Sequence, residues 1–243
     1  MKGKLAWGLL AVIGGYQLIK RLGSRSDATD EEVDASLPGD EVIPHPMIET
    51  THAITIQAPP SEVWRWLVQT GYRGAGRAGW YTDTPLIDPV ADLFFRLTTP
   101  PDRQQADRSW MHSADQILPE FQHSPAVGDI VPDGPPDTAY FVVRAVEPER
   151  YLILHSDTHV KLMTPAALQG TQWASYGEFT WNFILQPVGQ NSTRFILRTR
   201  ARFGPALFRR IAPPLLYLSE MIFPRQLLRG IKQRAERRAT SSD

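Results

Sequence analysis

A strand followed at once by a helix, within residues 51–81, most constrains what this chain can fold into. In Thr51–Gln57, apolar and polar side chains alternate, and a period of two is typical of a strand with one buried face. Pro59-Pro60 ends that strand, and a proline in the first turn is a favoured helix start. The helix that follows has one apolar face, formed by Val63, Trp66 and Leu67. The segment therefore predicts a strand, a tight turn and an amphipathic helix in succession.

The second half of the chain predicts a curved antiparallel sheet and a long terminal helix. Residues 139–146 and 151–155 have strand character, and the runs 176–186 and 192–203 alternate most clearly, with a hairpin turn between them. Arginines alternate with apolar side chains in the last run, so we expect one wet face on this sheet. The terminal helix has an apolar stripe, formed by Leu216, Phe223, Leu227 and Ile231, with a kink expected at Pro224. Together these features indicate an α+β fold.

Charge is balanced overall but unevenly distributed. The formal net charge is zero and cysteine is absent, which excludes disulfides and thiolate chemistry. Residues 26–49 carry eight acidic side chains and no Lys or Arg, whereas residues 194–243 carry twelve basic and three acidic ones. A basic tail can bind nucleic acid, but a solvated helix face is the commoner outcome. We therefore expect no nucleic-acid partner.

The N-terminal segment is uncharged from Leu5 to Ile19 and has basic residues on both sides. As a helix this run is about 22 Å long, against about 30 Å for a bilayer core. We expect residues 1–22 to form an uncleaved single membrane anchor, on a side of the membrane that the flanking charges leave open. A cleaved signal peptide and a soluble helix are the alternatives. Residues 23–49 then read as an acidic, proline-containing linker, and residues 50–239 as the ligand-binding domain.

The strand, Ala-Pro-Pro turn and helix with its Val-Trp pair resemble the start of the START-like, or SRPBCC, superfamily, which includes polyketide cyclases, lipid-transfer domains and the birch-pollen-allergen type. Three further segments are similar to bacterial members usually labelled only as SRPBCC proteins: SADQILPEFQ (113–122), GEFTWNFILQPVGQNSTRFILRTRARFGP (177–205) and MIFPRQLLRGIKQRAER (221–237). The resemblance covers roughly residues 50–238. It implies a helix-grip fold, in which the sheet wraps around the C-terminal helix with a cavity between them. It implies no catalytic set.

Aromatic and aliphatic side chains on one face of the predicted strands and helix are the candidates for the wall of a ligand cavity: Phe141, Val143, Phe179, Trp181, Phe183, Phe195, Leu197, Leu216 and Phe223. Three loop aromatics are candidates for its mouth: Trp80, Tyr81 and Trp110. We expect the protein to bind a hydrophobic small molecule or lipid. The alternatives are an enzyme of the polyketide cyclase or hydrolase type and a structural or interaction module with a filled core.

Polar clusters in the sequence point to chemistry only weakly. His155, Asp157 and His159 would share one face of a strand, as metal ligands would, but Lys161 nearby indicates an exposed end. We therefore expect no metal and no cofactor. The pair His112–Asp115 and the carboxylate Glu178, expected on the wet face near Arg198 or Arg200, read as surface groups. No Gly-x-Ser-x-Gly elbow occurs, so no catalytic residue is predicted.

Overall fold

The computed structural model describes residues 2–83, 89, 93, 112–162, 171, 176–205 and 208–239. The helices and 3-10 turns are α1 (Lys2–Ser24), α2 (Asp30–Asp34), η1 (Asp40–Val42), α3 (Pro60–Leu67), η2 (Arg73–Ala75), η5 (Pro119–Phe121), α5 (Thr158–Leu162), α6 (Phe208–Glu220) and α7 (Phe223–Ala239). The strands are β1 (Arg25–Ser26), β2 (Ile48–Ile56), β3 (Ile130–Pro132), β4 (Tyr140–Glu147), β5 (Tyr151–Ser156), β6 (Tyr176–Pro187) and β7 (Thr193–Gly204). Trp110 lies outside the described residues. Apolar spacing also predicts a helix at 84–97, and that segment lies outside them too, except for positions 89 and 93.

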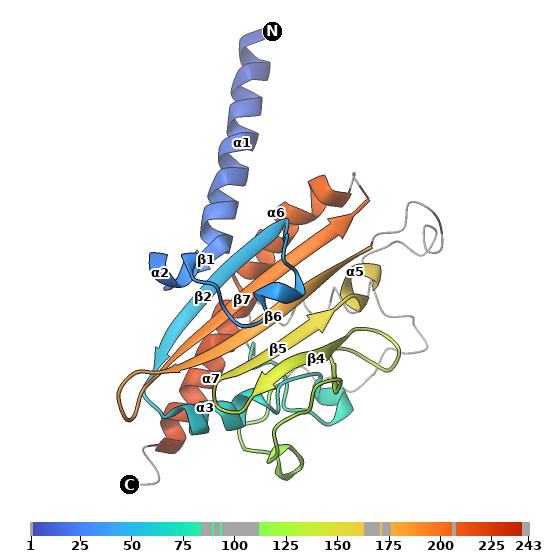
Figure 1. Cartoon of the computed structure of the whole chain (residues 1–243). Helices are drawn as coiled ribbons and strands as arrows, with labels where there is room; N and C mark the ends of the chain where they lie inside the picture. The colour runs from blue at the N-terminus through green and yellow to red at the C-terminus, as the bar shows by residue number, and fades with distance from the viewer. Residues whose placement is uncertain are drawn as a thin grey trace.

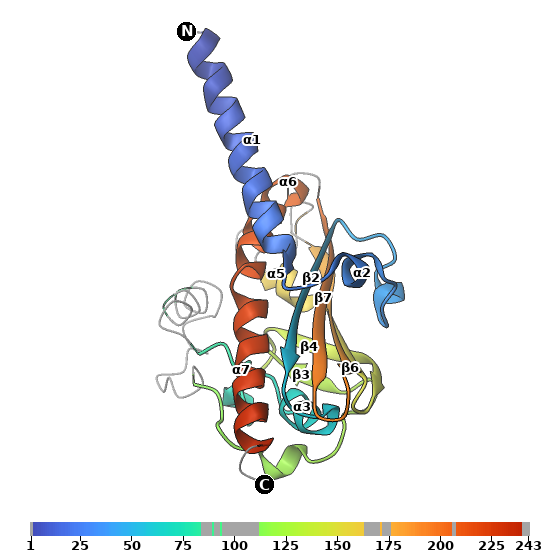
Figure 2. The ribbon, with the colours of Figure 1, turned by 90° about the vertical axis from the view of Figure 1, so that its left-hand side faces the viewer.

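The described strands form one seven-stranded sheet in the order β1-β2-β7-β6-β5-β4-β3. Short β1 runs parallel to β2, and every other neighbouring pair is antiparallel. The predicted hairpin is confirmed as β6 and β7, which pair from Tyr176–Gly204 to Pro187–Thr193. Helix α7 lies across one face of the sheet, and α2 lies on the opposite face (Figures 1 and 2). The fold is therefore the predicted α+β helix-grip arrangement.

The main core fills the space between the sheet, α3 and α7, and we call this side the inner face. Alternation along β6 and β7 turns Phe183, Leu185, Phe195 and Leu197 to this side, where all four are buried. Helix α3 contributes the apolar face predicted for it, and α7 contributes Leu227 and Ile231. The backbone of α7 at Gly230 lies against the backbone at Tyr81. A Cβ at position 230 would be 2.2 Å from the carbonyl oxygen of Tyr81, so a larger residue does not fit there.

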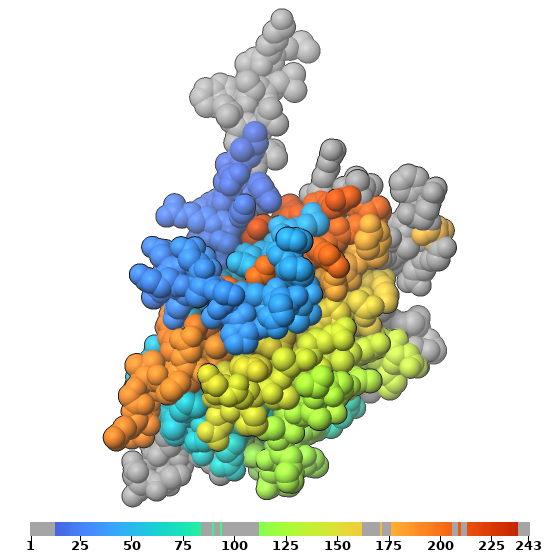
Figure 3. All heavy atoms as spheres, viewed as in Figure 1, coloured from blue at the N-terminus to red at the C-terminus, as the bar shows by residue number. Residues whose placement is uncertain are grey.

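The outer face of the sheet is covered, so the prediction of a wet face was wrong for this region. The acidic segment 26–49 folds back over the sheet through α2 and η1, and Figure 3 shows it in blue across the face toward the viewer. A second apolar cluster is buried beneath it, formed by Ala28, Leu37, Ala53, Ile153, Ile184 and Ile196. The division of the chain at residues 22 and 49 stays a prediction, but residues 26–49 are packed against the sheet.

Helix α1 extends away from the sheet and contacts the domain through its C-terminal end (Figures 1 and 2). Tyr16 and Ile19 pack beside Tyr217 of α6, and a Cβ at Gly23 would lie 2.1 Å from the Tyr217 carbonyl oxygen. The predicted membrane anchor was wrong: no helix in the described part of the chain combines the length and the apolar character that crossing a bilayer requires. The physical reason is that glycines, Tyr16 and Gln17 interrupt an apolar run that is already shorter than the ~20 residues of a span.

Candidate ligand-binding site

One end of the inner face carries a group of packed rings, which we call the aromatic cluster: Trp80, Phe141, His159, Phe179 and Trp181. Ring centroids are 5.1 Å apart for Trp80 and Trp181, and 5.1 Å apart for Phe141 and Trp181. The His159 ring lies 4.8 Å from the ring of Phe141. These residues meet because alternation places the aromatic positions of β4 and β6 on one face, while α5 and the segment after η2 supply the other two.

Burial changes along this wall. Phe183 and Phe195, deeper along the same face, are fully buried, with ring centroids 6.1 Å apart. Trp80, Phe179 and Trp181 remain half-buried. Trp is rarely buried completely even in packed proteins, so partial exposure of these rings marks the edge of the core. The inner face therefore grades from a filled core into a partly open aromatic rim.

A hydrogen-bonded pair, His159 and Asp133, holds the rim in place. The Nε2 atom of His159 lies 2.7 Å from Oδ2 of Asp133, and its Nδ1 atom lies 2.6 Å from the hydroxyl of Ser156. The other oxygen of Asp133 accepts a hydrogen bond from the indole of Trp80. Both ring nitrogens and both carboxylate oxygens therefore have partners within the chain. The pair thereby positions two rings of the cluster, those of Trp80 and His159.

Two buried polar atoms on the inner side have no such partners. Among the described residues, neither the indole nitrogen of Trp66 nor the hydroxyl of Thr199 makes a hydrogen bond, although both residues are buried. The amide of Gln69 shows the contrast: it donates to the Tyr81 hydroxyl at 2.7 Å and accepts from the backbone of Leu118 at 2.8 Å. Buried polar groups are rarely unpaired in folded proteins. Trp66 and Thr199 thus have hydrogen-bonding capacity that the described residues do not use.

The predicted ligand residues do not all lie in one place. The inner core holds Phe141, Val143, Phe183, Phe195 and Leu197. The rim holds Trp80, Phe179 and Trp181. Tyr81 is buried beneath α7, where burial raises the pKa of its phenol, and Leu216 packs in a separate cluster with Ile48 and Phe203. Phe223 is half-buried at the start of α7, and Trp110 lies outside the described residues. Contact of any of them with a ligand stays a prediction.

The candidate metal triplet does not share one face. Strand β5 ends at Ser156 and α5 begins at Thr158, so the alternation that would align the three side chains stops between them. His155 lies 2.7 Å from Glu178, Asp157 lies 2.9 Å from Lys161, and His159 turns to Asp133. Within the ranges that the structure describes, no three His, Cys, Asp or Glu side chains are grouped as metal ligands. Whether the protein needs a metal stays a prediction.

The other predicted polar groups have specific partners. Glu178 contacts His155 and Arg202 instead of the expected Arg198 or Arg200. Partial burial alone would raise its pKa, but hydrogen bonds from those two partners lower it overall, so the carboxylate stays ionised. Asp115 pairs with Arg234 at 3.0 Å, and its predicted companion His112 is exposed.

Sequence reasoning missed Asp133 and Ser156. Nothing in the sequence links Asp133 to His159, because these residues lie on different elements that only the folded sheet brings together. Ser156 lacks the glycine context of a nucleophile, so no sequence motif singles it out. The available signal was the short spacing of Ser156 and His159 at the end of a strand.

Comparison with known proteins gives only distant structural similarity. No protein family matches the chain, and no curated protein matches its sequence. Similar solved structures include protein MLL2253 from Mesorhizobium loti, with 18% identity, TM-score 0.36, and coverage of 77% of this chain and 97% of that one. Norcoclaurine synthase from Thalictrum flavum has 12% identity, TM-score 0.32, and coverage of 72% and 90%. CalU16 from Micromonospora echinospora has 16% identity, TM-score 0.29, and coverage of 79% and 86%. Likeness this distant carries no argument about activity.

Proposed function

We propose that this protein binds an apolar small molecule between the inner face of its sheet and α7, and that it belongs to the START-like superfamily that its sequence resembles. The observation that carries the proposal is the half-buried rim of Trp80, Phe179 and Trp181 beside a fully buried apolar wall. Ligand sites are mostly apolar and aromatic, with a few placed polar groups. The aromatic cluster and the two unpaired polar atoms match that description.

The unpaired atoms of Trp66 and Thr199 also favour a ligand that carries an oxygen atom. The indole of Trp66 can only donate a hydrogen bond, whereas the hydroxyl of Thr199 can donate or accept. A ligand oxygen beside either atom would satisfy it, since such an oxygen accepts from an indole or a hydroxyl. We therefore propose an apolar molecule with one carbonyl or hydroxyl group, a description that a lipid or a polyketide meets.

Binding is favoured over catalysis by the burial of the Ser156 hydroxyl that His159 contacts. Ser156, His159 and Asp133 are linked by hydrogen bonds in the order of a catalytic triad. A nucleophile must lie within reach of its substrate, but Ser156 is 2% exposed. A cyclase or hydrolase reaction at this group would first require Ser156 to become accessible. The remaining alternative is an interaction module with a filled core, and a ligand-binding experiment distinguishes it from the proposed function.

The test is retention of a ligand by the intact chain. The protein is incubated with a lipid extract and analysed by native mass spectrometry, beside a Leu197→Trp variant that fills the inner face. Ile196→Trp is the matched control, because Ile196 is the neighbouring buried residue and faces the other side of the sheet. We expect added mass on the wild type and on Ile196→Trp and none on Leu197→Trp, with similar thermal transitions in the two variants because both enlarge a buried residue. No added mass on the wild type would overturn the proposal.

A further inference from the structure

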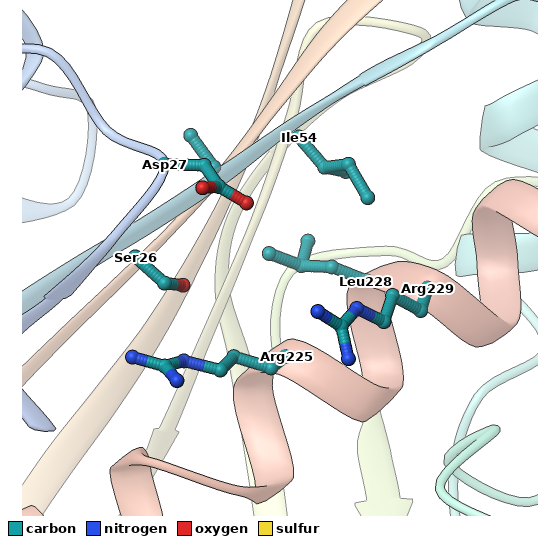
Figure 4. Close-up of a pocket in the computed structure, with 7 residues that line it drawn as sticks. Ser26, Asp27, Ile54, Arg225, Leu228 and Arg229 are labelled. Atoms are coloured by element: carbon teal, nitrogen blue, oxygen red, sulfur yellow. The ribbon is translucent and has the colours of Figure 1, made fainter. Parts of the chain in front are cut away.

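A cavity lies outside the inner core, between the β1–β2 edge of the sheet and α7, and we call it the edge pocket (Figure 4). Its volume is about 180 Å³, and its lining is formed by Ser26, Asp27, Ala53, Ile54, Arg225, Leu228 and Arg229. Leu228 also belongs to the inner core and lies between that core and the edge pocket. None of the predicted ligand residues lines this pocket.

Two guanidinium groups, one helical turn apart on α7, extend into the edge pocket (Figure 4). Arg225 donates from one terminal nitrogen to the carbonyl oxygens of Leu22 at 2.9 Å and Arg25 at 3.4 Å, but its buried Nε atom has no partner among the described residues. Arg229 is exposed and makes no hydrogen bond or ion pair within the described ranges. The pocket thus contains donors that the chain itself leaves unused.

We propose that the edge pocket binds a small oxyanion, a carboxylate or phosphate group, through Arg225 and Arg229. A guanidinium presents planar, paired donors that match the oxygens of either group. The Ser26 hydroxyl lies at the same wall and is held 2.9 Å from Nδ1 of His52, which fixes its position beside the arginines. Asp27, the next residue, has a φ of 53°, a left-handed conformation that is uncommon for a non-glycine residue. Strain of this kind persists where the surrounding structure fixes the backbone.

Asp27 is the one lining group that opposes an anion. Its carboxylate lines the pocket but forms no ion pair with either arginine (Figure 4). With two arginines and one aspartate, the lining has a net charge of +1, and exposed Asp27 is well solvated. The sign of its effect separates two kinds of ligand. Removal of this charge strengthens the binding of a simple anion, whereas it weakens the binding of a ligand that carries an ammonium group.

The experiment is a titration of the full-length protein with sodium phosphate and, separately, sodium acetate, at constant ionic strength set with chloride. Binding is followed by the thermal transition. We expect saturable stabilisation of the wild type by at least one of the two ions. Arg229→Gln is expected to weaken binding about tenfold, as loss of a charge-assisted hydrogen bond does. Asp27→Asn is expected to strengthen it. Arg225 is left intact because it also holds the end of α1.

Arg209→Gln is the matched control, because Arg209 is an exposed arginine of α6 that does not line the pocket. It removes the same charge and is expected to leave binding unchanged. Four results would overturn the proposal: no saturable effect of either ion, no weakening in Arg229→Gln, equal weakening in Arg209→Gln and Arg229→Gln, or weaker binding in Asp27→Asn. Uptake of a neutral apolar ligand is unaffected by any of these variants, so the result is independent of the function proposed for the inner face.

Discussion

The two faces of the sheet are built from the same strands but are held by opposite chemistry. Along β7, Phe195 and Leu197 point inward to α7, whereas Arg194, Arg198 and Arg200 point outward. The inner face is buried by apolar contact with α3 and α7. The outer face is buried by the acidic segment 26–49, which the arginines bind. Alternation therefore identifies two faces, but a polar face stays wet only if no complementary segment of the chain covers it.

Arg198 shows how completely the outer face is satisfied. Its side chain is 1% exposed. It donates to the hydroxyl of Thr51, to a carboxylate oxygen of Asp40 at 2.8 Å, and to backbone carbonyl oxygens at the end of α2, those of Glu32, Val33 and Ala35. All five donors of a guanidinium are used in this way. The arginine thus ties the acidic segment to the sheet.

The largest loss of stability is expected when Arg198 is replaced. Arg198→Met is expected to lower the free energy of unfolding by about 3–5 kcal/mol, because it leaves Asp40 and several carbonyls buried without their partner. Equilibrium urea unfolding at pH 7 measures the change. Arg202→Met is the control, since Arg202 is half exposed and lies on the same strand face. Equal small losses in both variants would mean that the outer face is not held by Arg198.

The inner face is probed by two residues of β6 that point the same way. Phe183→Ala is expected to cost about 3–5 kcal/mol, because Phe183 is 0% exposed in a packed core. Trp181→Ala is expected to cost clearly less, because its ring belongs to the half-buried rim. Urea unfolding of both variants gives the comparison. A full-size loss for Trp181→Ala would show that the rim is solid core.

A smaller, pH-dependent effect is expected at the start of α2. The hydrogen bond from Arg194, at 2.6 Å from Glu32, lowers the pKa of that carboxyl below its ordinary value of about 4.5. A lowered folded-state pKa contributes stability above the unfolded value and loses it as the pH falls. Glu32→Gln is therefore expected to cost about 1 kcal/mol at pH 7 and progressively less below about pH 4.5. Glu31→Gln, at an exposed neighbour in the same turn, is the matched control.

The smallest effect is expected at Thr199. Thr199→Val removes a buried hydroxyl that has no partner, so the unliganded protein is expected to change by less than about 0.5 kcal/mol. Thr193→Val, on the same strand, is expected to cost about 1–2 kcal/mol because its hydroxyl donates to the Ala58 carbonyl at 2.7 Å. Thermal melts of the two variants measure these changes in stability. A large loss for Thr199→Val would show that its hydroxyl is already bonded.

Local patterns in the sequence predicted most of the fold. The β2–α3 unit and the β6–β7 hairpin each follow from spacing within a short stretch. The expected single terminal helix with a kink at Pro224 was wrong: it is two helices, α6 and α7, because a proline favours the first turn of a new helix. The burial of the outer face was not predicted. Its two components, an acidic segment and an arginine-rich strand, are nevertheless both recognisable in the sequence. Arg198 and Asp40 are 158 residues apart, and charge complementarity over that separation gives no local signal. The membrane anchor was predicted wrongly from the uncharged N-terminal run, because an uncharged stretch alone does not supply the length of a membrane span.

The candidate site was predicted only on its apolar side. Period-two alternation identified Phe179, Trp181 and Phe183 because aromatic residues on one strand face share an environment. The polar partners were not predictable, because Asp133 meets His159 only through tertiary folding, and the unpaired state of Thr199 depends on every neighbour. The edge pocket likewise requires β1 to be placed beside α7.

The central claim is that the inner face holds a ligand, and binding of a neutral fluorescent probe tests it most directly. N-phenyl-1-naphthylamine has no charge, so the edge pocket does not attract it. We predict saturable binding of one probe per folded chain, with quenching of tryptophan fluorescence, retained in Ile196→Trp and lost in Leu197→Trp. Probe fluorescence that rises without saturation, or equally in both variants, would contradict the account and leave the inner face as a filled core.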